Sequence, residues 1–170
     1  MPQSLLIVGA GIYGRLVKEI ASDIGCFEKI DFLDDNSKVD DVVGRTDELE
    51  AFVGRYDEII VAIGNPDIRS DFYEKIVELP YNIATLISNK AYVSPSAIVG
   101  EGCVIEPMAV IHTECEIKKG CFISAGAVVN HAAVCEEFVH IDCNATVEGF
   151  ATVDKKNKVS AGCLYKKKLK

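Results

Sequence analysis

Three histidines are the side chains of this 170-residue chain best suited to moving a proton near neutral pH. They are His112, His131 and His140, and all three lie in the second half of the chain. His131 directly follows Asn130, and His140 comes nine residues after His131. A surface imidazole can act as a general base, but it can also be a solvated residue without a chemical role. For His112 we favour the second interpretation, and the residues alone leave the other two open.

A glycine-rich segment near the start of the chain offers a different chemistry, the binding of a phosphate group. Residues 9–14 read GAGIYG, which matches the G-x-G-x-x-G pattern between an expected strand and an expected helix. Glycines let the backbone approach a phosphate, and the helix N-terminus supplies N–H groups. Asp34 and Asp35 follow about twenty residues later, where a carboxylate could accept a hydrogen bond from a ribose hydroxyl or a base N–H. A tightly packed glycine turn beside a polar loop is the alternative.

Strands and helices alternate in the first half of the chain and must position this loop. Short apolar runs predict strands over residues 5–8, 29–33, 58–63 and 83–87. Apolar residues at helical spacing predict helices after the glycine loop and over residues 67–79, the second capped by Asn65. This alternation predicts a small parallel sheet with right-handed crossovers. Residues 1–88 have room for only one mononucleotide-binding half, so a nucleotide or nucleotide sugar fits better than NAD.

From about residue 90 the sequence follows a six-residue period instead. Every sixth residue from Val93 to Val159 is Val, Ile or Cys, and the residue four places later is mostly small. This is the hexapeptide repeat of a β-helix, in which three hexads form one triangular coil with inward-pointing aliphatic residues. None of the seven cysteines forms a C-x-x-C pair, so no metal site is predicted. Five are expected to point inward as small apolar side chains: Cys103, Cys115, Cys121, Cys135 and Cys163.

The composition narrows the class of protein further. Hydrophobic residues make up 49% of the chain, which is enough for a packed core. A net charge of -8 argues against nucleic acid or an anionic membrane surface as the main partner. No apolar run approaches the roughly 18 residues of a membrane span, and no Lys or Arg precedes the apolar start at Leu5. We therefore expect a cytoplasmic protein without membrane insertion.

Taken together, several segments resemble the PglD/NeuD-type sugar acyltransferases of the hexapeptide-repeat superfamily. The segments are GAGIYG, FLDD at 32–35, VAIGNPDIR at 61–69, AYVSPSAIVG at 91–100, SAGAVVNHAAV at 124–134 and EFVHIDCNATVEG at 137–149. The resemblance implies a Rossmann-like α/β domain, residues 1–88, that holds a UDP-sugar. It also implies a left-handed parallel β-helix, residues 89–170, that forms a homotrimer and binds acetyl-CoA between neighbouring subunits. The implied reaction moves an acetyl group to an amino or hydroxyl group of a nucleotide-linked or amino sugar, without a metal.

The resemblance also assigns roles to individual residues. His131 matches the general base of the family, and His140 matches a second histidine near the reacting groups. The residues that fall on the substrate-binding segments are Gly11, Tyr13, Gly14, Asp34, Asp35, Gly64, Asn65 and Arg69.

Three features depart from the family pattern. Ala132 stands where an acidic residue usually follows the catalytic histidine, and Ile12-Tyr13 stands where many relatives have Gly-His. The β-helix is also short, so we keep a catalytically weakened or inactive nucleotide-sugar-binding trimer, without a complete CoA site, as the alternative function. The end of the chain is rich in lysines that could meet the phosphates of CoA or simply be solvated: Lys155, Lys156, Lys158, Lys166, Lys167, Lys168 and Lys170.

Overall fold

The computed structural model describes residues 3–36 and 38–166 and divides into two compact units, with the division after Ala84. The sequence placed this boundary between residues 88 and 89. The strand expected over residues 83–87 is in fact two strands, because the chain passes from one sheet to another at this point. β5 (Asn82–Ile83) pairs with a strand of the first unit, and β6 (Leu86–Ile87) pairs with a strand of the second.

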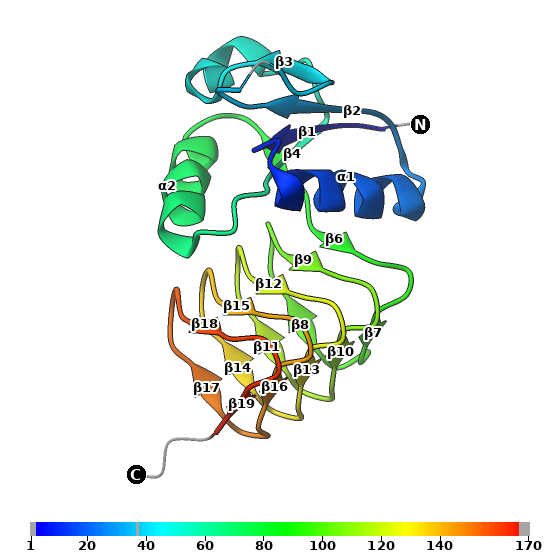
Figure 1. Ribbon diagram of the computed structural model, residues 1–170, viewed down its shortest axis with the longest axis vertical. Coiled ribbons are helices and arrows are strands. Elements are labelled where there is room, and N and C mark those ends of the chain that lie inside the picture. Colours follow the sequence, from blue (N-terminus) through cyan, green and yellow to red (C-terminus); the bar gives the residue numbers. More distant parts are fainter. Residues whose placement is uncertain (1–2, 37, 167–170) are drawn as a thin grey trace. The chain divides into compact units, whose positions relative to one another are not determined.

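The first unit is an α/β fold with a five-stranded parallel sheet in the order β3-β2-β1-β4-β5 (Figure 1). Its other elements are β1 (Gln3–Val8), α1 (Ile12–Ile24), β2 (Phe27–Leu33), β3 (Val42–Gly44), the 3-10 helix η1 (Thr46–Phe52), β4 (Glu58–Val61) and α2 (Pro66–Val77). The expected alternation of strands and helices is confirmed. The sequence did not predict β3, because three residues carry too little pattern.

Both faces of this sheet are covered, which explains why its central strand is apolar from Leu5 to Val8. The four residues from Leu5 to Val8 have no exposed surface. On one face, Phe52 of η1 and Ile76 of α2 join the apolar cluster of the strands. On the other face lies α1, whose Lys18 ammonium stands 5.3 Å from the centroid of the Phe32 ring. A strand buried on both sides reads as a continuous apolar run, as parallel sheets require.

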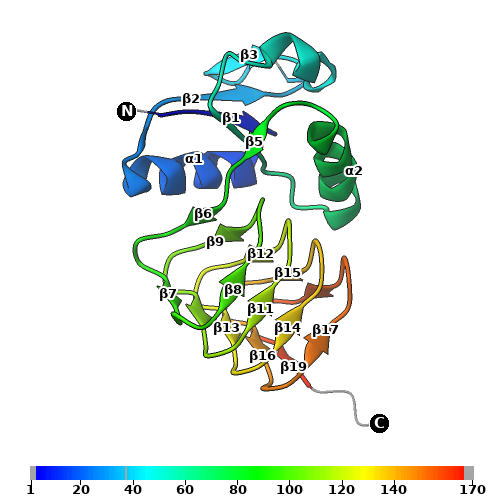
Figure 2. The same cartoon turned by 180° about the vertical axis from the view of Figure 1, so that it is seen from behind.

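The second unit is a parallel β-helix built from two-residue strands that recur every six residues (Figures 1 and 2). After β6 the strands are β7 (Tyr92–Val93), β8 (Ile98–Val99), β9 (Val104–Ile105), β10 (Val110–Ile111), β11 (Glu116–Ile117), β12 (Phe122–Ile123), β13 (Val128–Val129), β14 (Val134–Cys135), β15 (His140–Ile141), β16 (Thr146–Val147), β17 (Thr152–Val153), β18 (Lys158–Val159) and β19 (Leu164–Tyr165). Val110 pairs with Tyr92 on one side and with Val128 on the other, so successive coils are 18 residues apart. The predicted coil of three hexads is confirmed.

Three sheets form the sides of each coil and follow one another in chain order. Their strand orders are β19-β16-β13-β10-β7, β17-β14-β11-β8 and β18-β15-β12-β9-β6. At the turns between sheets, every sixth residue from Gly102 to Gly162 has a positive φ angle. The six-residue period is therefore a property of the backbone as well as of the core.

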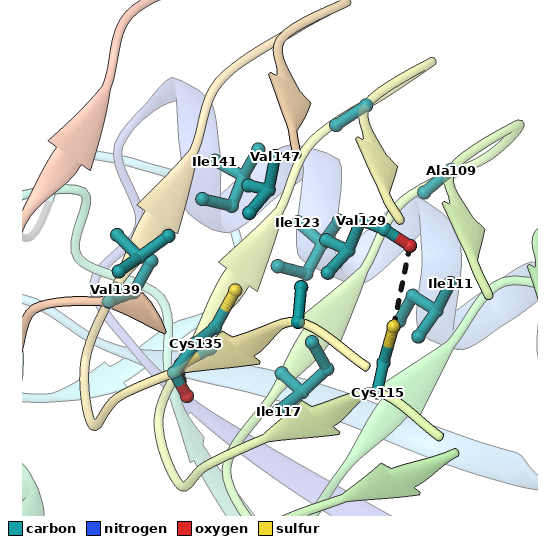
Figure 3. Close-up of a cluster of buried hydrophobic side chains, with 14 of the residues drawn as sticks. Ala109, Ile111, Cys115, Ile117, Ile123, Val129, Cys135, Val139, Ile141 and Val147 are labelled. Carbon is teal, nitrogen blue, oxygen red and sulfur yellow. Dashed lines mark hydrogen bonds between the residues drawn. The ribbon is translucent and has the colours of Figure 1, made fainter. Parts of the chain in front are cut away.

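The core of the β-helix consists of the side chains that the period placed inward (Figure 3). Ile111, Ile123 and Val129 have no exposed surface, and the small residue Ala109 packs beside them. Four of the five inward cysteines are buried, but Cys163 is exposed. Its side chain lies in the last coil of the described residues, where no further coil covers it.

Within residues 3–36 and 38–166, none of the helices combines the length and the hydrophobicity that a membrane span requires.

Candidate functional site

A cavity of about 440 Å³ in the first unit lies at the carboxyl ends of β1 and β4. The sheet order changes direction between these strands, since β2 and β3 lie on one side of β1 and β4 and β5 on the other. Ligands of open α/β sheets bind at such a switch point. The residues that line the cavity are Gly9, Gly11, Ile12, Tyr13, Asp34, Asp35, Thr46, Ala62, Ile63, Gly64 and Phe72.

The glycines of the GAGIYG loop have different roles at this cavity. Gly9 has a φ angle of 102°, and a Cβ on Gly14 would lie 1.9 Å from the carbonyl oxygen of Gly9. These two glycines therefore let the start of α1 pack against the end of β1. A Cβ on Gly11 would have no heavy atom within 4 Å, so this N-cap position of α1 leaves space for a ligand. Tyr13, in the first turn of the helix, also lines the cavity.

Asp34 lines the cavity and also holds the glycine loop in place. Its Oδ2 accepts a hydrogen bond from the backbone N–H of Ala10 at 2.6 Å, and its Oδ1 accepts one from that of Asn36 at 2.8 Å. Both carboxylate oxygens thus have backbone partners. The sequence predicted that the Asp34 carboxylate binds the ligand. Its two hydrogen bonds show that it also shapes the loop.

Asp35 lies next to it in a more exposed position and is held by Thr46. Oδ1 of Asp35 accepts hydrogen bonds from the backbone N–H of Thr46 at 3.2 Å and from its hydroxyl at 3.0 Å. These bonds, helped by the positive charge of Arg45, hold the pKa of Asp35 below its usual value. Asp35 therefore remains an anionic acceptor at the edge of the cavity. Thr46 was missed by sequence reasoning because no motif includes it.

The loop between β4 and α2 closes the cavity on another side. Gly64 lines the cavity, whereas the described lining residues do not include Asn65 or Arg69. Oδ1 of Asn65 accepts hydrogen bonds from the backbone N–H groups of Asp67 and Ile68, as expected for an N-cap. The buried Arg69 donates from Nη1 to the carbonyl oxygens of Ile63 at 2.8 Å and Gly64 at 3.1 Å. Arg69 and Asn65 thus shape the loop that carries Gly64.

His131 lies in the second unit, at the exposed turn between β13 and β14. Its Nδ1 is 2.8 Å from Oδ1 of Asn130, and the same oxygen accepts the backbone N–H of His131 at 2.8 Å. The Phe150 ring meets the imidazole edge to face, with ring centroids 5.0 Å apart and an interplanar angle of 86°. Gly149 adjoins the other ring nitrogen, since a Cβ there would lie 2.8 Å from Nε2.

His140 lies on β15, in a different sheet of the same β-helix. Its side chain is buried, with Nε2 at 3.1 Å from the hydroxyl of Ser124 and the Phe122 ring in an edge-to-face contact at 6.0 Å. A turn between two sides of a triangular coil points away from the third side. One copy of the β-helix therefore places His131 and His140 on different sides.

The lysines near the end of the β-helix are partly neutralised by the preceding coil. Lys155 pairs with Glu137 at 2.6 Å, and Lys158 pairs with Asp142 at 3.0 Å. These bonds lower the pKa of both carboxyl groups. The predicted positions Lys167, Lys168 and Lys170 lie outside the described residues. Among residues 3–36 and 38–166, no group of three or more His, Cys, Asp or Glu side chains could hold a metal ion.

Comparisons with known proteins agree with this architecture. Residues 4–76 match the PglD N-terminal domain, and residues 96–131 match the bacterial transferase hexapeptide (six repeats). The chain is 33% identical to the acetyltransferase domain of PglB from Neisseria gonorrhoeae FA1090, with a TM-score of 0.90 over 95% of this chain and 82% of that one. That domain in complex with acetyl coenzyme A gives 33% identity, a TM-score of 0.91, and coverage of 96% and 82%.

A more distant structure shares the fold. PerB from Caulobacter crescentus, in complex with CoA and GDP-perosamine, is 21% identical, with a TM-score of 0.82 over 97% of this chain and 91% of that one. An α/β domain followed by a hexapeptide β-helix is the architecture that this chain shares with these sugar acetyltransferases. The chain belongs to the PglD-type sugar acetyltransferases of the hexapeptide-repeat superfamily, which confirms the resemblance seen in the sequence, and it is therefore an enzyme.

Proposed function

We propose that this enzyme transfers an acetyl group from acetyl-CoA to an amino or hydroxyl group of a nucleotide-linked sugar, with His131 as the general base. The observation that carries the proposal is the environment of this imidazole. Its Nδ1 is hydrogen-bonded to Asn130, while its Nε2 adjoins a glycine at an exposed turn. An oriented imidazole with one accessible nitrogen is what proton removal from an acceptor requires.

The cavity of the α/β domain is proposed to hold the nucleotide part of the substrate, taken to be UDP from the family resemblance. Gly11 and Tyr13 at the start of α1 would meet the phosphates, aided by the backbone N–H groups of the helix. Asp35 would accept a hydrogen bond from the ribose or the base. Gly14, Asp34, Asn65 and Arg69 would act by holding the loops, and Gly64 by leaving space.

In the β-helix, the proposed reaction is a direct transfer. Acetyl-CoA supplies an activated thioester carbonyl when bound. His131 takes the proton of the acceptor nitrogen or oxygen as that atom forms its bond to the acetyl carbon, and the carbon–sulfur bond breaks to release CoA thiolate, which is then protonated. Holding the acceptor and the base in the right geometry supplies much of the rate. Because residue 149 is a glycine, it places no side chain against Nε2, and a Cβ there would lie 2.8 Å from this nitrogen.

We further propose that the working unit is a homotrimer with sites between copies. His131 and His140 lie on different sides of one coil, so a site that uses both must draw on two copies. The β-helix also carries large apolar side chains that are more than half exposed in one copy: Tyr92, Ile98, Met108, Phe150 and Leu164. Light scattering coupled to size-exclusion chromatography measures the number of copies.

Thermal unfolding with ligands is the first test of this function. Acetyl-CoA and UDP should each raise the midpoint if both sites exist, and GDP tests the choice of base. A coupled assay for the CoA thiol then follows transfer to nucleotide-linked amino sugars. Stabilisation by UDP without any response to acetyl-CoA would favour the non-catalytic alternative.

A further inference from the structure

We propose that Asn130 is the positioning residue of the catalytic base. Its side-chain oxygen holds the neutral imidazole of His131 in the tautomer that carries the proton on Nδ1 and leaves Nε2 as the acceptor. The proposal rests on the role of His131 given above. Ala132 stands where the family usually has an acidic residue, and it has no polar side-chain atom that could orient the imidazole. We assign this orienting role to Asn130 instead.

The hydrogen bonds around Asn130 determine the tautomer by elimination. One side-chain atom of Asn130 lies 2.8 Å from the backbone nitrogen of His131 and 2.8 Å from its Nδ1. A backbone N–H can only donate, so the amide atom that faces it must be the oxygen and not the nitrogen. An amide oxygen can only accept, so Nδ1 must carry the hydrogen. In the neutral ring, Nε2 then has the lone pair.

The next coil fixes the direction in which this lone pair points. The backbone N–H of Phe150 donates to the carbonyl oxygen of His131 at 3.0 Å, which keeps the two turns in register. The Phe150 ring stands against the imidazole, and Gly149 adjoins Nε2. The ring is thus held by Asn130 at one nitrogen and has a residue without a side chain next to the other.

The neutral charge of Asn130 distinguishes it from a carboxylate in the same position. A carboxylate on Nδ1 would stabilise the imidazolium by an ion pair, which an amide does not. The charged or titratable side chains of the neighbouring turns at this corner are His112, Glu114 and the buried Cys115 on the preceding coil and Glu148 on the following one. They stay unchanged when only residue 130 is varied, so differences between variants report on that position.

Two substitutions of Asn130 separate orientation from charge. Asn130→Leu removes the acceptor and should lower kcat roughly 10- to 100-fold, a part of the 10²–10⁴ that a general base contributes, with KM for acetyl-CoA changed less than about twofold. Asn130→Asp keeps an acceptor at this position and should retain most of kcat, while the acidic limb of the pH profile moves up by about one pH unit. His112→Ala, at the equivalent turn position one coil earlier, is the matched control and should behave as wild type.

Gly149→Ala tests the other side of the ring. The new Cβ would lie 2.8 Å from Nε2, so kcat should fall while the tautomer of His131 stays the same. Long-range ¹H–¹⁵N NMR reads the tautomer without any turnover, with the His131 signals assigned from His131→Ala. Nε2 should be the unprotonated nitrogen in wild type and in Gly149→Ala, and the two tautomers should mix in Asn130→Leu.

The possible failures are distinguishable. If wild type is active, His131→Ala is inactive and Asn130→Leu keeps the wild-type kcat and pH profile, Asn130 is not a positioning residue. A protonated Nε2 in wild type would also overturn the assignment, even for a protein without turnover. Full activity of His131→Ala would instead remove the base from the proposed function. Circular dichroism checks that each variant is folded, and Asn130→Asp serves if the leucine variant is not.

Discussion

The two units of this protein position their functional residues in different ways. In the α/β unit, residues distant in sequence hold one another through specific polar contacts, such as Asp34 to the N–H of Ala10 and Asp35 to Thr46. In the β-helix, position follows from the coil register, and the contact that orients His131 comes from its sequence neighbour Asn130. A period can place a side chain on a turn, but a pocket in a loop region depends on contacts across the fold.

The core of the β-helix also contains hydrogen bonds that its cysteine thiols donate. The inward thiols of Cys103, Cys115 and Cys121 donate to turn carbonyl oxygens 15 residues later, at 3.1, 3.0 and 3.0 Å. Burial raises the pKa of Cys115, so its thiol keeps the hydrogen that it donates. These cysteines were expected to be small apolar side chains, and the structure adds a hydrogen-bonding role. The carbonyl that Cys115 holds belongs to Asn130, next to His131.

The largest expected effect is the loss of turnover in the β-helix without any effect on the α/β unit. His131→Ala should lower kcat by about 10²- to 10⁴-fold, because it removes the proposed base. The UDP-induced rise in melting temperature should remain, since the proposed nucleotide cavity lies in the other unit. An unchanged kcat would show that proton removal does not need this histidine.

The second largest effect is expected from a substitution that damages the α/β unit and leaves the turn with His131 unchanged. Gly14→Ala places a Cβ 1.9 Å from the backbone oxygen of Gly9, so either the helix or the loop must move. We expect a loss of several kcal/mol in stability and of UDP binding. Gly11→Ala is the matched control for stability, because a Cβ there has no neighbour within 4 Å. Urea denaturation compares the two variants, and equal stabilities would contradict the packing role of Gly14. UDP titration compares Gly14→Ala with wild type only, because Gly11 lies in the proposed phosphate site.

A smaller effect tests the thiol hydrogen bonds. Cys115→Ala removes both a buried sulfur and the donor to Asn130, and it should cost about 1 to 2 kcal/mol of unfolding free energy. Cys26→Ala, at an exposed cysteine of the α/β unit, should stay within about 0.5 kcal/mol of wild type. If the two variants have equal urea midpoints, the inward thiol contributes no more than an exposed one.

The smallest effect concerns stability in acid, which depends on the partners of two carboxylates, Asp35 and Glu137. The pKa of Asp35 is lowered by hydrogen bonds from Thr46, and that of Glu137 by its bond to Lys155. A carboxyl group with a depressed folded-state pKa adds stability above its unfolded pKa, near 4, and loses it as pH falls through the folded value. Both units should therefore weaken below about pH 4.

Salt separates the two cases. Going from about 0.01 M to about 1 M salt shortens the Debye length from about 30 to about 3 Å, which screens an exposed ion pair. The acid sensitivity that Glu137→Gln removes should shrink in high salt, whereas that removed by Asp35→Asn should change less. Urea midpoints at pH 6 and pH 3.5 measure both, and an equal salt response would contradict the distinction between the two partners.

The parts of this protein that repeat, or that involve only neighbouring residues, could be predicted from the amino-acid sequence. The six-residue period predicted which side chains of the β-helix point inward, because each of them must pack against the inward side chain of the neighbouring coil. The G-x-G-x-x-G loop and the Asn65 cap were also readable, since a turn or a helix start is set by a few adjacent residues. The short strand β3 and the passage from β5 to β6 were not, because two or three residues carry no period.

The pairs of polar atoms that form hydrogen bonds could not be predicted in this way and follow from the folded structure. Asp34 holds the glycine loop, and Arg69 is buried against the carbonyl oxygens of its own loop, although the family resemblance placed both on substrate-binding segments. Thr46 reaches the cavity from a segment without any motif. His131 and His140, nine residues apart, lie on different sides of a coil. Hydrogen bonds require atoms within about 3 Å, and that precision comes from the packing of segments distant in sequence.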